Sequence, residues 1–394
     1  MLMRLMAYGK NILLLSVIFA LSSLATNLIV PLWPIYIRSL GASMTELGYV
    51  FSISNAVAAG LQIPSGMISD KYGRKRLHVI GTLVGVFPPL LYTFAKSWFD
   101  LIPWVILAGI SMGLYLPIRW SIVADDSTVQ TRAMVYSWVN VAWLAGPTVA
   151  PLVGGVMADV YGIRTPFLGC FALMGLTFPL TFLLRETRRS TFHLQHEAKD
   201  EPKASSFLSV ILIFTFINVM QGIGIGIYSP ITPVFLKERF SLDLTFVGLL
   251  YAIGFGLASV VVQVPGGWWA NRYGKKKILI VTFALSAPFL SFFALSQNIT
   301  ELIVFMLLSN AILNFSWPAF QALLMDLTPS AKWGLMNGIS ATTFWTGMMM
   351  GSAASGLLWD TFGMFIPYHV SAIAIFLSAV PALFLKEPSR SGQC

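Results

Sequence analysis

Twelve apolar runs follow one another along the 394 residues, and each is long enough to cross the hydrocarbon core of a membrane as a helix. Backbone groups in lipid must be satisfied within the spanning segment, so long continuous runs form helices rather than the short alternating strands of a barrel. The sequence therefore predicts an all-α membrane protein, with spans at 11–38, 44–68, 77–95, 100–124, 133–158, 165–184, 208–236, 244–269, 277–296, 301–325, 336–358 and 366–385.

The basic residues are divided unequally between the two predicted faces. With the N-terminus inside, 19 of the 25 Lys and Arg residues fall on the inner side, and the outer side holds only Arg38, Lys96, Arg164, Lys237 and Arg239. Such an excess marks cytoplasmic loops, so we expect both termini inside, in a multi-pass protein of the plasma membrane. The net charge of +9 is then explained by the excess of basic residues on the cytoplasmic side, and a nucleic-acid partner is not expected. We expect a monomer whose partners are the lipid bilayer and a small-molecule substrate.

One short motif occurs twice, 201 residues apart. Residues 62–76 read QIPSGMISDKYGRKR, and residues 263–277 read QVPGGWWANRYGKKK. The same offset relates Pro117 to Pro318 and Gly162 to Gly363. An internal repeat of this kind predicts two similar six-helix bundles related by an axis along the membrane normal. We place the bundles at 1–185 and 207–394, joined by a polar cytoplasmic linker at 186–206.

These motifs carry a resemblance to a known family. Gly66, Asp70, Gly73 and Arg74, followed by Lys75 and Arg76, resemble the loop between helices 2 and 3 of major facilitator superfamily transporters. Gly146-Pro147, followed eight residues later by Gly154-Gly155, resembles the fifth-helix motif of the drug:proton antiporter branch. The fourth-helix pattern is incomplete, because residues 101–105 lack the arginine that usually opens it. The resemblance covers essentially the whole chain and implies twelve transmembrane helices in two pseudo-symmetric six-helix bundles, with a substrate site between them.

The 66–76 loop is the predicted gate on the cytoplasmic side. Gly66 permits close helix approach, and Gly73 permits a positive φ at the turn. The resemblance implies that Asp70 faces the start of helix 11, where a positive helix end favours an anion. Asn271 replaces this aspartate in the second copy, so we expect the latch there to be weaker.

Two further groups of residues are predicted to serve gating. Arg74 is expected to pair with Asp125 or Asp126 at the inner end of helix 4, which would favour the outward-open state. The alternative is that the basic residues only set orientation. Gly146 and Pro147 predict a bend in helix 5, since proline removes a helix hydrogen bond and glycine permits bending. The alternative is the ordinary abundance of both residues in membrane helices.

Arg119 falls inside an apolar span, where a charge costs at least a few kcal/mol. Ionisable groups in such positions usually face a cavity, so we expect a role in substrate binding or coupling. Two alternatives remain, an arginine that snorkels to the inner interface and a structural pair with Asp125 or Asp126.

Neutral polar and aromatic residues in the middle of the spans are the other candidates for substrate binding: Asn27, Asn140, Asn218, Gln221, Tyr228, Asn310, Asn314 and Trp317. The alternative is that these side chains join one helix to another. None of the 16 acidic residues falls at mid-span. A strongly cationic substrate is therefore disfavoured relative to a neutral, amphipathic or anionic one.

The chain shows neither a Walker-type loop nor a catalytic constellation nor a metal-ligand cluster, which predicts a non-enzymatic secondary transporter with no cofactor and no metal. A proton is the one coupling ion considered. The preferred prediction is proton-linked efflux of small amphipathic organic compounds by alternating access. One alternative is an uptake carrier or uniporter for a sugar, organic anion or other nutrient, and another is a non-transporting receptor or lipid scramblase.

Overall fold

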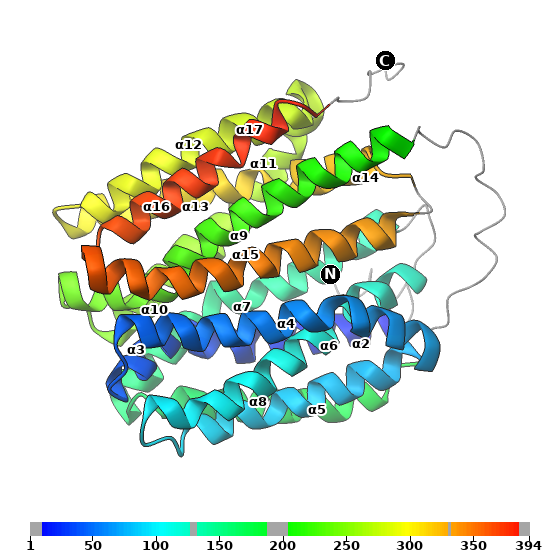
Figure 1. Ribbon diagram of the computed structural model, residues 1–394. Helices are drawn as coiled ribbons and strands as arrows, with labels where there is room; N and C mark the ends of the chain where they lie inside the picture. The colour runs from blue at the N-terminus through cyan, green and yellow to red at the C-terminus, as the bar shows by residue number, and fades with distance from the viewer. Residues whose placement is uncertain (1–9, 127–131, 187–203, 330–331, 386–394) are drawn as a thin grey trace.

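The computed structural model describes residues 10–126, 132–186, 204–329 and 332–385, and within them the chain is helical (Figure 1). Consecutive helices join into twelve rods. The first six are α2–α3 (Lys10–Ile29, Trp33–Ser39), α4 (Met44–Tyr72), α5 (Arg74–Tyr92), η1–α6 (Trp98–Leu101, Ile102–Asp125), α7 (Arg132–Tyr161) and α8 (Thr165–Phe182). The last six are α9 (Ala204–Phe240), α10–η3–α11 (Leu244–Tyr251, Ala252–Leu257, Ala258–Tyr273), α12 (Lys275–Leu295), α13–α14 (Ile299–Phe315, Trp317–Asp326), α15 (Trp333–Phe362) and α16–α17 (Ile366–Leu377, Ala379–Ala382).

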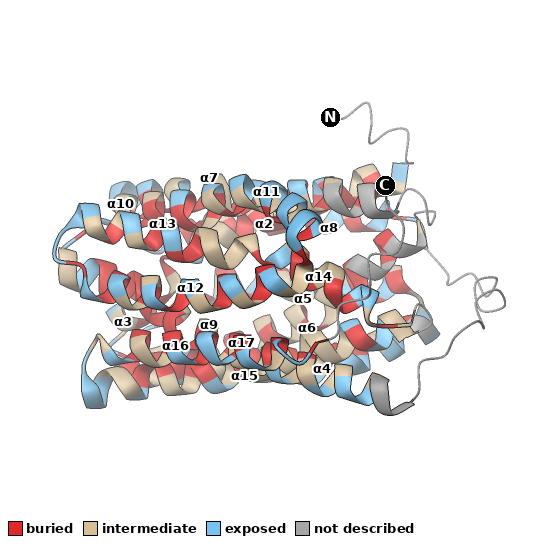
Figure 2. Ribbon diagram, turned by 90° about the horizontal axis from the view of Figure 1, so that it is seen from above, coloured by how far each residue is buried: buried red, intermediate tan, exposed pale blue. Residues whose placement is uncertain are grey.

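The predicted fold class is confirmed. Eight rods of the described chain are long and apolar enough to cross a membrane, and α4, α5, α15 and the shorter apolar segment Ile366–Ala382 complete the set. Exposed positions recur along the helices, and large apolar side chains such as Leu212 and Val261 are 60% exposed, as expected for surfaces in lipid (Figure 2). The predicted linker falls largely on residues 187–203, which lie outside the described residues, so the domain boundaries stay a prediction.

The helix ends follow local sequence signals. Ser43 Oγ accepts a hydrogen bond from Glu46 N at 3.1 Å, and the Glu46 carboxylate accepts one from Ser43 N at 2.7 Å. This capping box begins α4. Gly73 ends the helix with a φ of +100°, and Gly274 ends α11 with a φ of +106°. Both turns therefore need glycine, because a side chain rarely tolerates that backbone region.

Two ends of the molecule are named from here on. The basic end is the one where α4 meets α5 and α11 meets α12, beside Lys75 and residues 275–277. The far end is the opposite one, where α7 and α15 finish. In Figure 1 the basic end lies to the right and the far end to the left.

The internal repeat is visible in the aromatic packing of the two halves. In the first half, the Tyr36 and Phe167 rings lie 4.8 Å apart and the Tyr92 ring lies 6.1 Å from Phe167. In the second half, Tyr368 takes the place of Phe167, 5.1 Å from Phe235 and 5.5 Å from Phe293. The offset of 201 residues relates Tyr92 to Phe293 and Phe167 to Tyr368, and an offset of 199 relates Tyr36 to Phe235, so equivalent rings occupy equivalent positions of each bundle.

Helices α4 and α15 run antiparallel and belong to different bundles. At the far end their backbones touch: a methyl group on Gly48 would lie 2.5 Å from Ser352 O, and one on Gly356 would overlap Met44 O. Extending the numbering of that contact along the two antiparallel helices pairs Gly66 with Gly338 near the basic end, and a methyl group on either would meet no described atom within 4 Å. Among these glycines the tight contact is thus confined to the far end, where this conformation is closed.

Candidate functional site

A cavity of about 260 Å³ lies between the two bundles, where α2, α7, α9 and α10–η3 approach one another. Both bundles line it, with Asn27, Val30, Pro147 and Pro151 from the first and Ile225, Tyr228, Ser229, Tyr251 and Phe255 from the second. None of these nine residues is charged. The polar groups are one amide and three hydroxyls, and the remaining walls are apolar.

The aromatic side of the cavity comes from the second bundle. The Tyr251 and Phe255 rings lie 4.6 Å apart with 31° between their planes, and both Tyr228 and Tyr251 are buried. Phe255 lies in the π-helical segment η3, which begins directly after Tyr251. Stacked rings with hydroxyl groups suit a flat organic molecule that makes a small number of hydrogen bonds.

Three residues predicted from the sequence meet at this cavity: Asn27, Tyr228 and Pro147. The site predictions had not included Ile225 or Phe255. These two are apolar residues in apolar helices, so nothing in the sequence separates them from residues that face lipid or the core. Only the packing of the helices shows that they line the cavity.

Other predicted binding residues serve contacts between helices. Asn218 Nδ2 donates to Ser340 Oγ at 2.9 Å, which joins α9 to α15. Gln221 Nε2 donates to Ser378 Oγ at 2.6 Å, beside the start of α17. Both contacts lie within the second bundle, away from the cavity lining.

The remaining polar candidates are also separate from the cavity. Asn310 Nδ2 donates to Met306 O and Asn314 Nδ2 to Asn310 O, each at 2.9 Å along the helix that contains them. Trp317 is 52% exposed, with its ring 6.1 Å from Phe320. Asn140 is partly buried on α7 and does not line the cavity.

The Gly146-Pro147 step forms a tight contact between α7 and α2. Proline lacks an N–H, so Pro147 leaves the carbonyl of Trp143, one turn earlier, without its helical donor. Ser23 Oγ on α2 donates to Trp143 O at 2.5 Å and replaces the missing donor. Gly146 permits this approach, since a methyl group there would overlap Ser23.

Ser23 also supports the cavity. Asn27 Nδ2 donates to Ser23 O at 2.9 Å and to Ser23 Oγ at 3.3 Å. The Asn27 amide at the cavity is thus positioned by the same serine that donates a hydrogen bond to Trp143 O in α7. The sequence analysis did not predict Ser23. Pro147 nevertheless indicated that the carbonyl of Trp143, four residues earlier, would need a hydrogen-bond donor from outside α7.

Arg119 lies in the interior of the first bundle, not in the central cavity. Its guanidinium carbon is 4.3 Å from the Trp143 ring, 5.0 Å from Phe19 and 6.0 Å from Tyr115, and the residue is 7% exposed. The side chain is therefore held by cation–π contacts, each worth about 2 kcal/mol or more when desolvated. It does not snorkel to the interface.

A small cavity of about 20 Å³ adjoins Arg119, with room for about one water molecule. His78 also lines it and is 2% exposed. Neither ring nitrogen of His78 has a hydrogen-bond partner among the described residues. A cavity of this size with a guanidinium and an imidazole in its wall suits a bound water or a very small anion, and it is too small for an organic substrate.

The gate residues lie at the basic end. The side chains of Asp70 and Asp125 lie outside the described residues, so the predicted latch through them stays a prediction. Arg74 is buried, as the prediction of a partner requires. The position equivalent to Arg74 in the second half is Lys275, which forms an ion pair with Asp326. That pair joins the start of α12 to the end of α14.

Asp126 ends α6 at the same face and accepts a hydrogen bond from Asn11 Nδ2. Asn11 Oδ1 in turn accepts from Arg185 N at 3.0 Å. Burial raises the pKa of Asp126 above its usual value, and the Asn11 hydrogen bond offsets part of that rise. Asp126 therefore binds a proton more readily than an exposed aspartate.

Known proteins resemble the chain over nearly its whole length. The model of the Major Facilitator Superfamily matches residues 15–220 and 214–393. An uncharacterized MFS-type transporter of Methanocaldococcus jannaschii is 26% identical, over 92% of this chain and 95% of that protein. The multidrug resistance protein MdtG of Proteus mirabilis is 23% identical, over 92% and 93%.

A solved structure agrees with the fold. The crystal structure of a D-xylose–proton symporter superposes with a TM-score of 0.76 at 16% identity, over 94% of this chain and 96% of that one. At this identity the likeness concerns architecture alone. Two six-helix bundles, a cavity between them and a family model that spans both halves agree: the chain belongs to the Major Facilitator Superfamily of membrane transporters.

Proposed function

We propose that this transporter exports small, uncharged amphipathic organic compounds in a proton-linked cycle of alternating access. The observation that carries the proposal is the cavity between the bundles, which is lined by aromatic and apolar groups, one amide and three hydroxyls, with no charged residue. A cationic compound would lose its hydration there without a carboxylate to replace it. The name of the Proteus mirabilis relative, a multidrug resistance protein, supports export.

We further propose that the basic end faces the cytoplasm, because the clustered Lys and Arg residues follow the rule for cytoplasmic loops. The conformation described above, closed at the far end, is then the one that loads from the cytoplasm. Closure at the basic end and opening at the far end would release the substrate outside.

Asn27 is the cavity residue whose loss is easiest to interpret. We expect Asn27→Ala to raise the KM for transport about fivefold or more, because one hydrogen bond to substrate is lost. Asn140→Ala is the matched control, an amide that is likewise partly buried but does not line the cavity, and it should leave KM unchanged. Equal effects of the two substitutions would argue against substrate binding in this cavity.

Asp126 is the proposed proton-binding group. Its raised pKa means that lowering the pH toward that value protonates it in this conformation before an ordinary aspartate would be protonated. We expect Asp126→Asn to remove the dependence of flux on an imposed pH gradient while substrate binding persists. Glu301→Gln, at the start of α13 and away from the gate, is the control. A normal gradient response in Asp126→Asn would assign coupling elsewhere.

The decisive experiment is flux into proteoliposomes under an imposed pH gradient, with three labelled probes. Chloramphenicol is neutral and amphipathic, tetraphenylphosphonium is a cation, and D-xylose is a sugar. Uphill movement of chloramphenicol driven by the proton gradient supports the proposal. Gradient-independent D-xylose flux would favour an uptake carrier or uniporter, and binding without flux of any probe would favour a receptor.

A further inference from the structure

An eight-residue pattern occurs four times in this chain, always where a helix ends. It reads Gly, three residues, Asp or Asn, one residue, an aromatic residue and Gly, at 66–73, 155–162, 267–274 and 356–363. The last glycine has a positive φ in every copy, of +100°, +94°, +106° and +87° for Gly73, Gly162, Gly274 and Gly363. Two copies end α4 and α11 at the basic end, and two end α7 and α15 at the far end.

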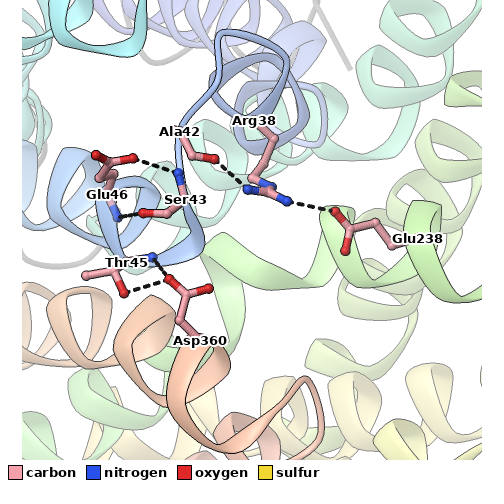
Figure 3. A network of polar contacts seen from close by, with 7 residues as sticks. All are labelled: Arg38, Ala42, Ser43, Thr45, Glu46, Glu238 and Asp360. Carbon is pink, nitrogen blue, oxygen red and sulfur yellow. Dashed lines mark hydrogen bonds and ion pairs between the residues drawn. The ribbon is translucent and has the colours of Figure 1, made fainter.

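At the far end the aspartate of each copy reaches a helix of the other bundle. Asp360 of α15 accepts hydrogen bonds from Thr45 N at 2.8 Å and Thr45 Oγ1 at 2.7 Å, at the start of α4 (Figure 3). Asp159 of α7 accepts from Thr245 N at 2.7 Å, Thr245 Oγ1 at 2.6 Å and Leu244 N at 3.2 Å, at the start of α10.

These carboxylates complete the caps of two helices. A helix leaves its first N–H groups without internal acceptors. The local cap takes only the third of them: Ser43 accepts from Glu46 N and Asp243 accepts from Phe246 N. The aspartate of the opposite bundle takes the second. Its negative charge also lies at the positive end of the helix dipole.

The first glycine of the pattern explains why the aspartate can reach the helix start of the opposite bundle. A methyl group on Gly356, one turn before Asp360, would overlap Met44 O. A methyl group on Gly155, one turn before Asp159, would overlap Leu244 O. Each glycine therefore brings the partner helix start into contact, and the carboxylate one turn later binds its exposed N–H groups.

We propose that Asp159 and Asp360 are positioning residues for transport, a pair of latches that close the far end and must release for it to open. The far end has an aspartate in both copies, whereas the basic end has one aspartate, Asp70, and one asparagine, Asn271. The difference favours the conformation closed at the far end. The surface ion pair of Arg38 and Glu238, 3.4 Å apart and about one-third exposed, adds little (Figure 3).

The inference rests on alternating access, and it is independent of the substrate and of the direction of transport. A cysteine in place of Ser355 reports far-end opening, because Ser355 is fully buried against Gly48 between α4 and α15. The background variant replaces Cys170 and Cys394 with alanine. Maleimide labelling of the purified protein in detergent, without substrate, then measures how often the far end opens.

We expect Asp159→Ala and Asp360→Ala each to raise the labelling rate about fivefold, and the double variant about 25-fold. Glu46→Ala is the matched control: it removes a carboxylate from the same start of α4, but that carboxylate belongs to the same bundle. It should change the rate less than twofold. A monodisperse double variant labelled at the background rate would overturn the proposal, as would a Glu46→Ala effect equal to that of Asp360→Ala.

A second measurement tests the proposal if the double variant fails to fold. The Thr45 and Asp360 side chains meet across the far end, with 2.7 Å between Oγ1 and Oδ2, so a short bifunctional methanethiosulfonate should crosslink Thr45→Cys to Asp360→Cys in the closed conformation. Crosslinking should stop probe flux, and a reductant should restore it. Undiminished flux through the crosslinked protein would show that this contact does not open during transport.

Discussion

Gly338→Trp should lower the transport rate about 5- to 150-fold while leaving the protein folded. The numbering of the far-end contact, extended along the two helices, pairs Gly338 on α15 with Gly66 on α4, and a methyl group on either meets open space. We therefore expect a larger side chain at Gly338 to be tolerated in the present conformation. When the basic end closes, the two helices must approach in the register that they already keep at the far end, and the indole would then occupy the space of a backbone. Overpacking of this kind costs about 1–3 kcal/mol or more, and each 1.4 kcal/mol is a factor of ten in the equilibrium.

The measurement is the initial rate of probe flux together with the thermal melting temperature. Gly175→Trp on α8 is the matched control, because a methyl group on Gly175 also meets no described atom within 4 Å, and α8 does not take part in the contact between α4 and α15. Normal flux in Gly338→Trp would mean that α4 and α15 do not close on one another at the basic end.

Gly356→Ala should act in the opposite direction and drive the far end open. The new methyl group would overlap the carbonyl of Met44, and a backbone group cannot move aside as a flexible side chain can. The intrinsic gain of alanine over glycine in a helix, about 1 kcal/mol, is smaller than the cost of that overlap. The bundles must therefore separate at this contact, and we expect at least a tenfold shift toward the conformation that is open at the far end.

Gly175→Ala is the control for this substitution. It places the same methyl group on α8, where nothing lies within 4 Å of it and where no contact between α4 and α15 is involved, and should leave the equilibrium unchanged. Tryptophan fluorescence quenching or distance measurements between spin labels on α4 and α15 would follow the separation. A Gly356→Ala variant that keeps the far-end distance of the parent protein would show that the helix contact yields by local bending.

The sequence was sufficient for the fold because the membrane allows few solutions. Each long apolar run must be a helix, and the offset of 201 residues between 62–76 and 263–277 required two equivalent halves. The aromatic groups around Phe167 and Tyr368 show how closely the halves correspond. Hydropathy therefore predicted each whole helix, and the repeat predicted each whole bundle.

The site was harder to predict from the sequence. An amide in the middle of a span can line a cavity or join two helices, and the sequence looks the same in both cases. Asn27 lines the cavity, whereas Asn218 reaches Ser340 on a neighbouring helix. The choice depends on which face of each helix meets the other bundle. Phe255 presented a different difficulty, because an apolar wall residue is indistinguishable in sequence from one that faces lipid.

The enclosed position of Arg119 has an electrical consequence. Arginine stays charged in proteins, and the rings of Phe19, Tyr115 and Trp143 hold this one inside the first bundle. In the proposed cycle, rocking of that bundle would carry the charge, with any group paired to it, through the membrane field, in which a full crossing of one charge is worth about 2.3 kcal/mol per 100 mV. We therefore expect the membrane potential to act on the moving bundle itself, and the turnover of an uncharged cargo to acquire a voltage dependence that its own chemistry lacks.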